Sequence, residues 1–167
     1  MNRYMGQSRC KSNRYMGQSR WTITMEIMME KVFSLHPQLY KDCIALADLP
    51  LCKVLLCNDK AYPWFILVPR VSDVKDIYQL NRRDQQAFLQ ESSFLSELLM
   101  TEFSGDKLNV AALGNLVPQL HIHHIVRFEN DFCWPKPVWG QQGLTPYSAA
   151  QIEGIKKRIQ PKLALFT

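Results

Sequence analysis

The stretch of residues 118–127, PQLHIHHIVR, holds three of the four histidines in the chain. Gln119, His121 and His123 follow one another at intervals of two residues, and residues spaced in this way along a β-strand point to the same face. The residues between them, including His124, then point to the opposite face. The pattern predicts a strand that presents one amide and two imidazoles side by side, an arrangement suited to binding and attacking a phosphate.

Four further strands are predicted around this stretch, each as a short apolar run next to turn residues such as Pro, Gly, Asn or Asp. These runs lie at residues 43–49, 53–57, 64–68 and 108–113, and residues 119–128 make the fifth strand. Because a short turn at Gly114-Asn115 separates the last two strands, we expect them to pair as an antiparallel hairpin.

Helical patterns are predicted at both ends of the chain and in its middle. In the long helix at residues 81–103, Asn81 caps the first turn and Asp84 stands at the third position. Five residues at helical spacing form its buried face: Phe88, Ser92, Leu95, Leu99 and Phe103. Another short helix is expected at residues 74–80, and Ser148 with Gln151 forms a capping box for a final helix.

Prolines limit three other segments. A helical pattern at residues 21–33 should end at His36-Pro37, because proline lacks the backbone amide and restricts the residue before it. Pro161 should kink or end the final helix. The segment FCWPKPVWG at residues 132–140 has two prolines and two tryptophans, so we expect an extended apolar strap packed on a surface or at a subunit interface.

The charge of the chain is concentrated at its N-terminus. Residues 1–20 hold five of the 20 basic residues and no acid, which leaves 15 basic and 15 acidic residues in the rest of the chain. The sequence NRYMGQSR occurs twice in this segment, at residues 2–9 and 13–20. We therefore divide the chain into a duplicated basic arm at residues 1–20, a domain at residues 21–147 and a C-terminal helix at residues 148–167. A basic arm on a neutral domain is weak evidence for nucleic-acid binding, so no specific nucleic-acid partner is expected.

Cysteine and hydrophobic patterns indicate a cytoplasmic protein. The five cysteines form no CxxC pair and are odd in number, which favours reduced thiols. No apolar run approaches the roughly 18 residues of a membrane span, so no membrane association is expected.

The histidine stretch resembles the motif of the histidine triad (HIT) family of nucleotide hydrolases and transferases, His-φ-His-φ-His-φ-φ with φ apolar. Upstream, Asn109 followed by Gly114 and Asn115 is similar to the phosphate loop of that family. The order of elements agrees from about residue 43 to residue 127, and the resemblance is to members of the bacterial diadenosine tetraphosphate hydrolase type. It implies an α+β fold, in which a five-stranded antiparallel sheet packs against a long helix, often in a homodimer.

The resemblance also assigns roles to individual residues. His121 takes the position of the nucleophile, and His123 the position that contacts the phosphate and leaving-group oxygens. The chain departs from the motif where Gln119 replaces the first histidine and Leu116 stands where many members carry Ser or Thr. Trp64 also falls near a Gly-His pair of many members, while His124 replaces an apolar residue and Val126 a proline.

These residues support covalent nucleotidyl transfer. A neutral imidazole is nucleophilic near neutral pH, so His121 can attack an α-phosphate, and water can then hydrolyse the nucleotidyl-histidine. Gln119 would help to order the site. Asn109, Gly114 and Asn115 can donate hydrogen bonds to phosphate oxygens, and Arg127 fits a phosphate contact or a solvated strand end equally well. The substrate would be a dinucleoside polyphosphate or a nucleoside phosphoramidate.

Other functions stay open at this point. The scheme requires no cofactor or metal bound by the protein, although the substrate can be a magnesium complex. The sequence His121-Ile122-His123-His124 could bind zinc or copper, but adjacent residues diverge on a strand and a closed zinc site needs about four ligands. A nucleotide-binding homologue with little or no catalysis is the main alternative, which Gln119 and Leu116 favour. His36 fits a helix end, and His124 a hydrogen-bonded or exposed bystander.

Overall fold

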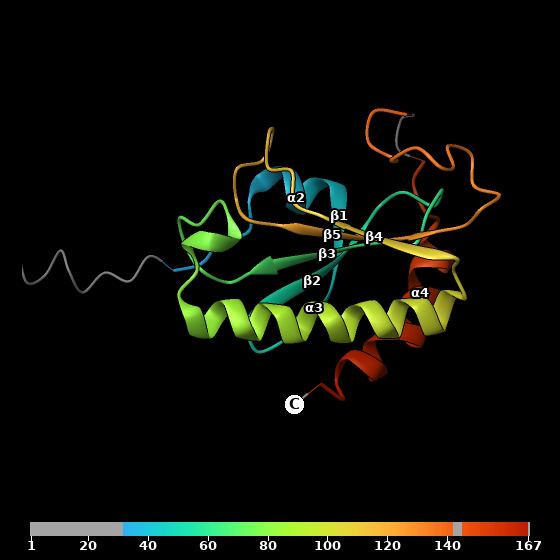
Figure 1. The fold of residues 1–167 in the computed structure, drawn as a ribbon. Coiled ribbons are helices and arrows are strands. Elements are labelled where there is room, and N and C mark those ends of the chain that lie inside the picture. Colours follow the sequence, from blue (N-terminus) through green and yellow to red (C-terminus); the bar gives the residue numbers. More distant parts are fainter. Residues whose placement is uncertain (1–31, 142–144, 167) are drawn as a thin grey trace, which may run out of the picture. The chain divides into compact units, whose positions relative to one another are not determined.

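The structure is a computed structural model and describes residues 32–141 and 145–166. The basic arm and the helix predicted at residues 21–33, apart from its last two residues, lie outside the described residues. Residues from 33 onward form one compact unit built on a five-stranded antiparallel sheet (Figure 1). The strand order is β1-β2-β3-β5-β4, with bounds Cys43–Asp48 (β1), Cys52–Cys57 (β2), Trp64–Pro69 (β3), Ile122–Arg127 (β5) and Lys107–Ala111 (β4).

The histidine stretch enters the interior of this sheet. Every residue of β3 and β5 is buried, which explains why these two strands read as nearly continuous apolar runs. Along β3, Phe65 and Leu67 belong to one hydrophobic core, whereas Trp64 and Ile66 belong to a second core on the opposite face. The sheet therefore carries a core on each face, and alternate side chains of β5 enter different environments.

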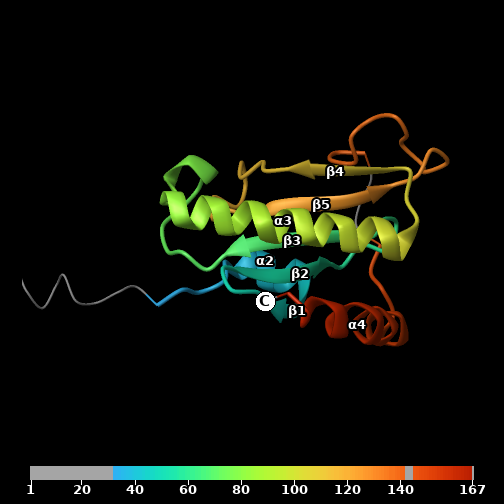
Figure 2. The ribbon, with the colours of Figure 1, turned by 60° about the horizontal axis from the view of Figure 1, so that its bottom comes forward.

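Helix α3 (Arg82–Phe103) covers one face of the sheet, and α2 (Pro37–Asp42) lies on the other (Figure 1). The Asn81 side chain accepts a hydrogen bond from the Asp84 amide, which confirms the predicted cap. Ser104 adopts a left-handed conformation that ends the helix. Helix α4 (Ala149–Leu163) contributes Ile159 and Leu163 to the same core as α3. Its ribbon lies beside β1 (Figure 2). The predicted α+β architecture is confirmed.

The His36-Pro37 pair begins a helix, α2, that the sequence did not predict; the helix expected to end at this pair lies outside the described residues, apart from its last two. The His36 side chain accepts a hydrogen bond from the Gln38 amide, and Pro37 occupies the first turn of α2. Proline suits the first turn because its missing N–H has no partner within a helix there. The same residue pair can thus stop one helix or start the next.

Four predictions on local structure need correction. Residues 74–80 contain only the short 3-10 helix η1 (Ile77–Gln79), and β5 begins at Ile122 instead of residue 119. Pro161 lies inside α4, two residues before its end. Residues 132–140 are not extended but fold into turns, with hydrogen bonds such as Lys136 N to Cys133 O at 2.7 Å. β4 and β5 pair antiparallel as expected, although a longer loop joins them.

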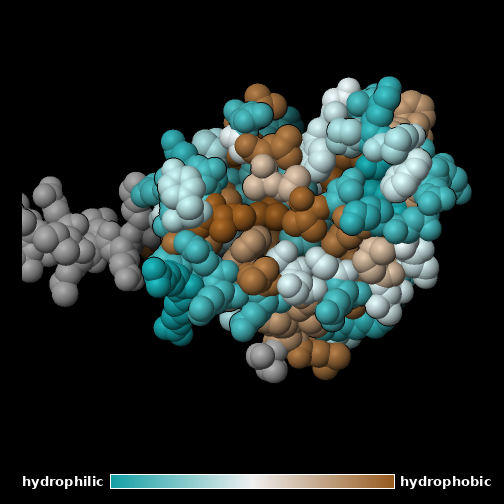
Figure 3. Space-filling view, in the orientation of Figure 1, coloured by the Kyte–Doolittle hydropathy of each residue, from teal (hydrophilic) through white to brown (hydrophobic). Residues whose placement is uncertain are grey.

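The surface of the molecule carries both apolar and hydrophilic residues. In Figure 3, apolar residues form a band in the middle of the visible face, and smaller apolar patches lie near its upper and lower edges among hydrophilic residues. Within residues 32–141 and 145–166, no helix is long and apolar enough to cross a membrane.

Candidate functional site

A cavity of about 880 Å³ opens on the α2 face of the sheet, and His121 and His123 both line it. Its walls come from α2 and the start of β1, the end of β2, the start of β3, the loop at residues 113–117 and the turn at residues 139–140. Segments far apart in the sequence therefore meet around the two imidazoles. The lining also includes Asp42, Cys43, Cys57, Trp64, Gly114, Asn115, Leu116 and Trp139.

His121 is held in a single tautomer by its own backbone. Its Nδ1 lies 2.6 Å from the carbonyl oxygen of Gln119. A carbonyl oxygen only accepts hydrogen bonds, so Nδ1 must carry the proton. In the neutral ring, Nε2 then keeps its lone pair, and that nitrogen is the nucleophilic atom of the side chain.

His123 is held in the opposite tautomer by a different partner. The indole nitrogen Nε1 of Trp64 lies 2.9 Å from His123 Nδ1. An indole N–H only donates, so Nδ1 of His123 must accept and the proton of the neutral ring resides on Nε2. Burial, followed by the charges of His121 and His124, lowers the pKa of His123 to about 3. His123 is thus a neutral N–H donor near neutral pH.

Aromatic rings surround His123. The ring centroids of His121 and His123 lie 5.0 Å apart, and Trp64 and Trp139 each lie 5.5 Å from His123 in edge-on contacts. The Trp139 indole nitrogen is buried and has no hydrogen-bond partner among the described residues. The rings exclude water from His123, which is the physical origin of its lowered pKa.

The predicted phosphate loop lines the cavity in part. Gly114 and Asn115 both contribute to its wall, and Gly114 has a φ of 71°, which a residue with a side chain rarely adopts. Leu116 follows in the same loop with 95% of its surface exposed. The loop thus brings backbone amides, an asparagine and an apolar side chain to the mouth of the cavity.

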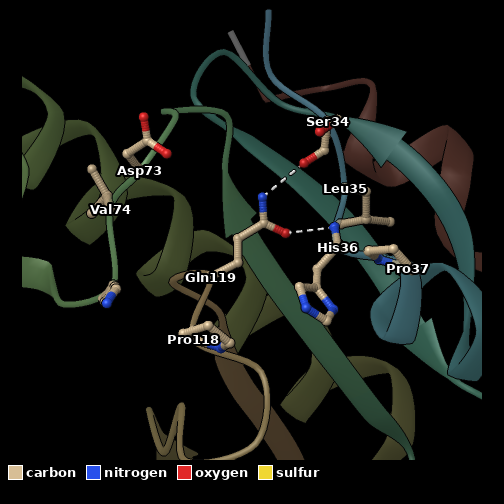
Figure 4. Close-up of a pocket in the computed structure, with 9 residues that line it drawn as sticks. Ser34, Leu35, His36, Pro37, Asp73, Val74, Pro118 and Gln119 are labelled. Carbon is tan, nitrogen blue, oxygen red and sulfur yellow. Dashed lines mark hydrogen bonds between the residues drawn. The ribbon is translucent and has the colours of Figure 1, made fainter. Parts of the chain in front are cut away.

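Gln119 does not lie where the alternation predicted. It precedes β5, and its side chain leaves the cavity of the histidines to line a smaller one of about 310 Å³ (Figure 4). There its oxygen accepts from the His36 amide at 2.8 Å, and its nitrogen donates to the Ser34 carbonyl at 2.9 Å. The side chain fastens the segment before α2, whereas the backbone carbonyl of the same residue orients His121.

Arg127 and Asn109 also lie outside the cavity, although the sequence predicted Asn109 as a phosphate contact and left Arg127 open between a phosphate contact and a solvated strand end. Arg127 is 1% exposed and forms two hydrogen bonds with Asp131, at 2.6 and 3.0 Å. It donates a third to Asn109 Oδ1 at 2.8 Å and a fourth to the Lys136 carbonyl at 3.0 Å. The Asp131 side chain raises the pKa of Arg127, which stays charged. The guanidinium therefore fastens the turn at residues 131–136 to the sheet.

His124 points away from the cavity, as predicted. It is fully buried, and its Nε2 accepts from the Ser92 hydroxyl of α3 at 2.8 Å. Its Nδ1 lies 3.2 Å from the Ile122 carbonyl and must donate to it. Burial lowers the pKa of His124 to about 4. The ring is a neutral link between the sheet and α3.

Sequence reasoning did not place most of the cavity-lining side chains in the site, and Cys43, Cys57, Trp64 and Trp139 are among those it missed. Trp64 had a weak signal as a departure from the family motif, and Trp139 as part of the Trp- and Pro-rich segment. Within residues 32–141 and 145–166, no lysine or arginine lines the cavity, and Asp42 is the acidic side chain in its wall. Among the residues that the structure describes, no group of three or more His, Cys, Asp or Glu side chains could hold a metal ion.

Comparisons with known proteins agree on one family. A family model described as HIT domain matches residues 38–130. A histidine triad protein from Marinobacter aquaeolei VT8 is 52% identical, with 81% of this chain and 99% of that chain covered and a TM-score of 0.80. One from Bradyrhizobium japonicum is 42% identical, with coverages of 79% and 98% and a TM-score of 0.77. One from Sinorhizobium meliloti 1021 is 36% identical, with coverages of 80% and 98% and a TM-score of 0.77. Among curated proteins, none matches the chain.

Proposed function

The chain belongs to the HIT domain family, and from this premise we propose that it is a nucleotidyl hydrolase or transferase whose nucleophile is His121. The observation that carries the proposal is the pair of fixed tautomers in the cavity. His121 keeps a lone pair on Nε2, and His123 keeps a proton on Nε2. A nucleophile and a hydrogen-bond donor thus stand side by side in a site large enough for a nucleotide.

The proposed reaction has two steps. His121 Nε2 attacks the α-phosphorus, the bond from phosphorus to the leaving oxygen or nitrogen breaks, and a nucleotidyl-histidine forms. Water then attacks the same phosphorus, and the bond to His121 breaks. Dividing one displacement into two lowers the barrier of each, because imidazole is both a good nucleophile and a good leaving group.

His123 and the loop would stabilise the charge on the phosphate. The Nε2–H of His123 donates without bearing a charge, and the Gly114 and Asn115 amides offer further donors at the cavity wall. The described part of that wall contains no lysine or arginine, so within it the charge would be stabilised by aligned dipoles and by any magnesium that the substrate brings. Dinucleoside polyphosphates and nucleoside phosphoramidates both fit this scheme.

A second candidate is nucleotide binding with little or no turnover. Leu116 favours it, because an exposed leucine cannot donate a proton or a hydrogen bond to a leaving group. The Gln119 side chain does not distinguish turnover from binding alone, because it lies outside the cavity of the histidines.

Trapping the covalent intermediate tests the proposal. Wild-type protein and His121→Ala are incubated with adenosine- and guanosine-based dinucleoside polyphosphates and phosphoramidates, and the reactions are quenched in base. We expect turnover and a nucleotidyl adduct on His121 in the wild type only. Wild-type turnover no faster than that of His121→Ala would refute hydrolysis, and nucleotide binding retained in that case would support the second candidate.

We also propose a homodimer and a cytoplasmic location. Strand β4 is an edge of the sheet and Val110 on it is 49% exposed, while Phe132, in the turn region after β5, is 76% exposed. An unpaired edge with exposed apolar side chains can pair with a second copy. Light scattering with size-exclusion chromatography tests the dimer, and the mass of a monomer would refute it.

A further inference from the structure

The hydrogen bond from Trp64 to His123 joins two residues that the sequence separates by 59 positions. Trp64 begins β3 and pairs with Ile125 of β5, so its side chain lies on the same face of the sheet as His123. Both side chains are about nine-tenths buried. The bond therefore lies in a shielded environment where a single donor can decide the state of the ring.

We propose that Trp64 is a positioning residue, which keeps His123 neutral and keeps its Nε2–H directed at the phosphate. The indole N–H has no titration in water near neutral pH and cannot accept a proton. If His123 took up a proton at Nδ1, two donors would face each other and the bond to Trp64 would be lost. The catalytic part of this inference rests on the proposed function, whereas the state of the imidazole does not.

Other titratable groups around His123 do not supply the same restraint. His121 contacts its ring edge, and His124 follows it on the opposite face of β5. Asp42, Cys43 and Cys57 line the same cavity from α2, β1 and β2. A carboxylate such as Asp42 would favour the protonated form of the His123 ring. The Trp64 N–H that donates to Nδ1 opposes this protonation.

Trp139 provides a matched control. Both tryptophans contact the His123 ring edge-on at 5.5 Å, but the Trp139 nitrogen has no partner among the described residues. Replacing either tryptophan by phenylalanine keeps an aromatic ring at that place. Only Trp64→Phe removes a hydrogen bond to His123.

Nitrogen NMR of histidine-labelled full-length protein tests the inference without substrate. We expect neutral His123 with its proton on Nε2 in the wild type and in Trp139→Phe, from about pH 5 to 8. In Trp64→Phe we expect a mixture of tautomers and protonation at higher pH, and Trp64→His should restore a donor, although one that titrates. His123 signals in a folded Trp64→Phe that equal those of the wild type would overturn the inference, as would a wild-type proton on Nδ1.

Kinetics give the second readout. In Trp64→Phe we expect kcat to fall by about 10²-fold with a smaller change in KM, because a displaced donor weakens the transition state. The dependence of kcat on pH in Trp64→Phe should also show an additional transition that comes from the titration of His123. If wild-type protein hydrolyses no nucleotide, the NMR result still decides the tautomer, so the two proposals fail separately.

A second inference comes from an independent observation, the cysteine pair at the cavity wall. Cys43 of β1 and Cys57 of β2 are register partners, and both line the cavity. The Asn58 amide donates to the Asp42 carbonyl at 2.9 Å, so Asp42 and Asn58 form a hydrogen-bonded pair of the antiparallel ladder. Hydrogen-bonded and non-hydrogen-bonded pairs alternate along such a ladder, so the next pair, Cys43 and Cys57, is a non-hydrogen-bonded one. At such positions the Cα atoms are about 4.5 Å apart, within the range that a disulfide requires.

We infer that Cys43 and Cys57 form a reversible disulfide when the protein meets hydrogen peroxide. The Cys43 sulfur attacks one peroxide oxygen, the O–O bond breaks, and one water leaves with a sulfenic acid on Cys43. The Cys57 sulfur then attacks the Cys43 sulfur, and the second water leaves with the Cys57 proton. The hydrogen bond with Cys43, followed by burial, raises the pKa of the Cys57 thiol, and Cys43 is the more exposed of the two, so oxidation begins at Cys43.

Peptide mass spectrometry of peroxide-treated full-length protein tests this second inference, which does not depend on the proposed function. We expect a Cys43–Cys57 linked peptide that dithiothreitol removes, and we expect the same peptide in Cys10→Ser. In Cys57→Ser, Cys43 should instead accumulate as sulfinic acid. Peroxide-treated wild type that carries no such link, whether Cys43 is overoxidised, paired elsewhere or unmodified, would overturn the inference.

Discussion

His123 and His124 are neighbours on β5, and both are buried, neutral imidazoles, yet only one of them is available to a ligand. His124 uses both ring nitrogens, with Ser92 on one side and the Ile122 carbonyl on the other. His123 has Trp64 at Nδ1, and its ring lines the cavity. Burial and a lowered pKa therefore do not identify a reactive histidine by themselves; what distinguishes it is a nitrogen that faces open space.

The largest effect should come from the nucleophile on the cavity side. His121→Ala should lower kcat by on the order of 10⁴-fold, because the covalent route is lost and only binding and oxyanion stabilisation remain. The Ser92→Ala/His124→Leu double variant removes the buried polar pair on the other face and should keep kcat within about threefold. Steady-state kinetics on one nucleotide substrate measure both. Equal losses of kcat in the two variants would contradict the expectation that only the cavity side of β5 takes part in the reaction.

The next effect concerns the far end of the His123 face, where the same side of β5 ends in a buried ion pair. Asp131→Asn leaves the Arg127 guanidinium charged, 1% exposed and without its carboxylate. Breaking a buried pair in this way costs about 3–5 kcal/mol in the free energy of unfolding. Urea unfolding near neutral pH measures this cost. A loss below about 1 kcal/mol would mean that Asn109 and the Lys136 carbonyl suffice for Arg127.

The acid stability of the fold should depend on His124. Its pKa falls from 6.5 to about 4 on folding, so the unfolded chain binds more protons between these values. The contribution to stability is complete above about pH 6.5, and about 3 kcal/mol is lost as the pH falls toward 4. Asp131 and His123 also have lowered pKa values, so they too make the folded state less stable as the pH falls. The contribution of His124 must therefore be measured by comparing the wild type with a variant that lacks this histidine.

The Ser92→Ala/His124→Leu double variant provides that comparison. Removing both partners of a buried hydrogen bond can be nearly neutral, so stability near pH 7 should change by about 1 kcal/mol or less. Between about pH 6.5 and 4 the double variant should lose less stability than the wild type by the amount assigned to His124. Urea unfolding across this range measures the difference, and parallel pH curves would show that His124 does not titrate on folding.

The sequence predicted the elements of the sheet better than the surroundings of the histidines. Apolar runs and turn residues located all five strands, because burial on both faces leaves little choice of side chain in β3 and β5. The direction of His124 also followed from alternation alone. The same alternation failed for Gln119, because β5 begins three residues later and a strand rule does not apply before the strand.

Side-chain partners were beyond the reach of the sequence. The sequence predicted Asn109 as a phosphate contact and left Arg127 open between phosphate and solvent, but the Arg127 guanidinium binds Asp131, Asn109 and the Lys136 carbonyl. Trp64 and His123 meet only because β3 and β5 are neighbours in the sheet, which depends on contacts between distant segments. A pattern in one segment gives residue types and faces, whereas the partner of a given nitrogen depends on the tertiary fold.

The smallest effect is expected at Gln119 and tests the correction made to its role. Gln119→Ala removes two hydrogen bonds to Ser34 and His36 but keeps the backbone carbonyl that orients His121. We therefore expect a loss of about 1–2 kcal/mol in unfolding free energy and a change in kcat below about threefold. The protonation state of His121, read by nitrogen NMR, should be unchanged. The Gln119 backbone carbonyl is present in the wild type and in Gln119→Ala, so only the side-chain amide differs between them. If a folded Gln119→Ala lost as much kcat as His121→Ala, the Gln119 amide would act in the site although it points into the other cavity.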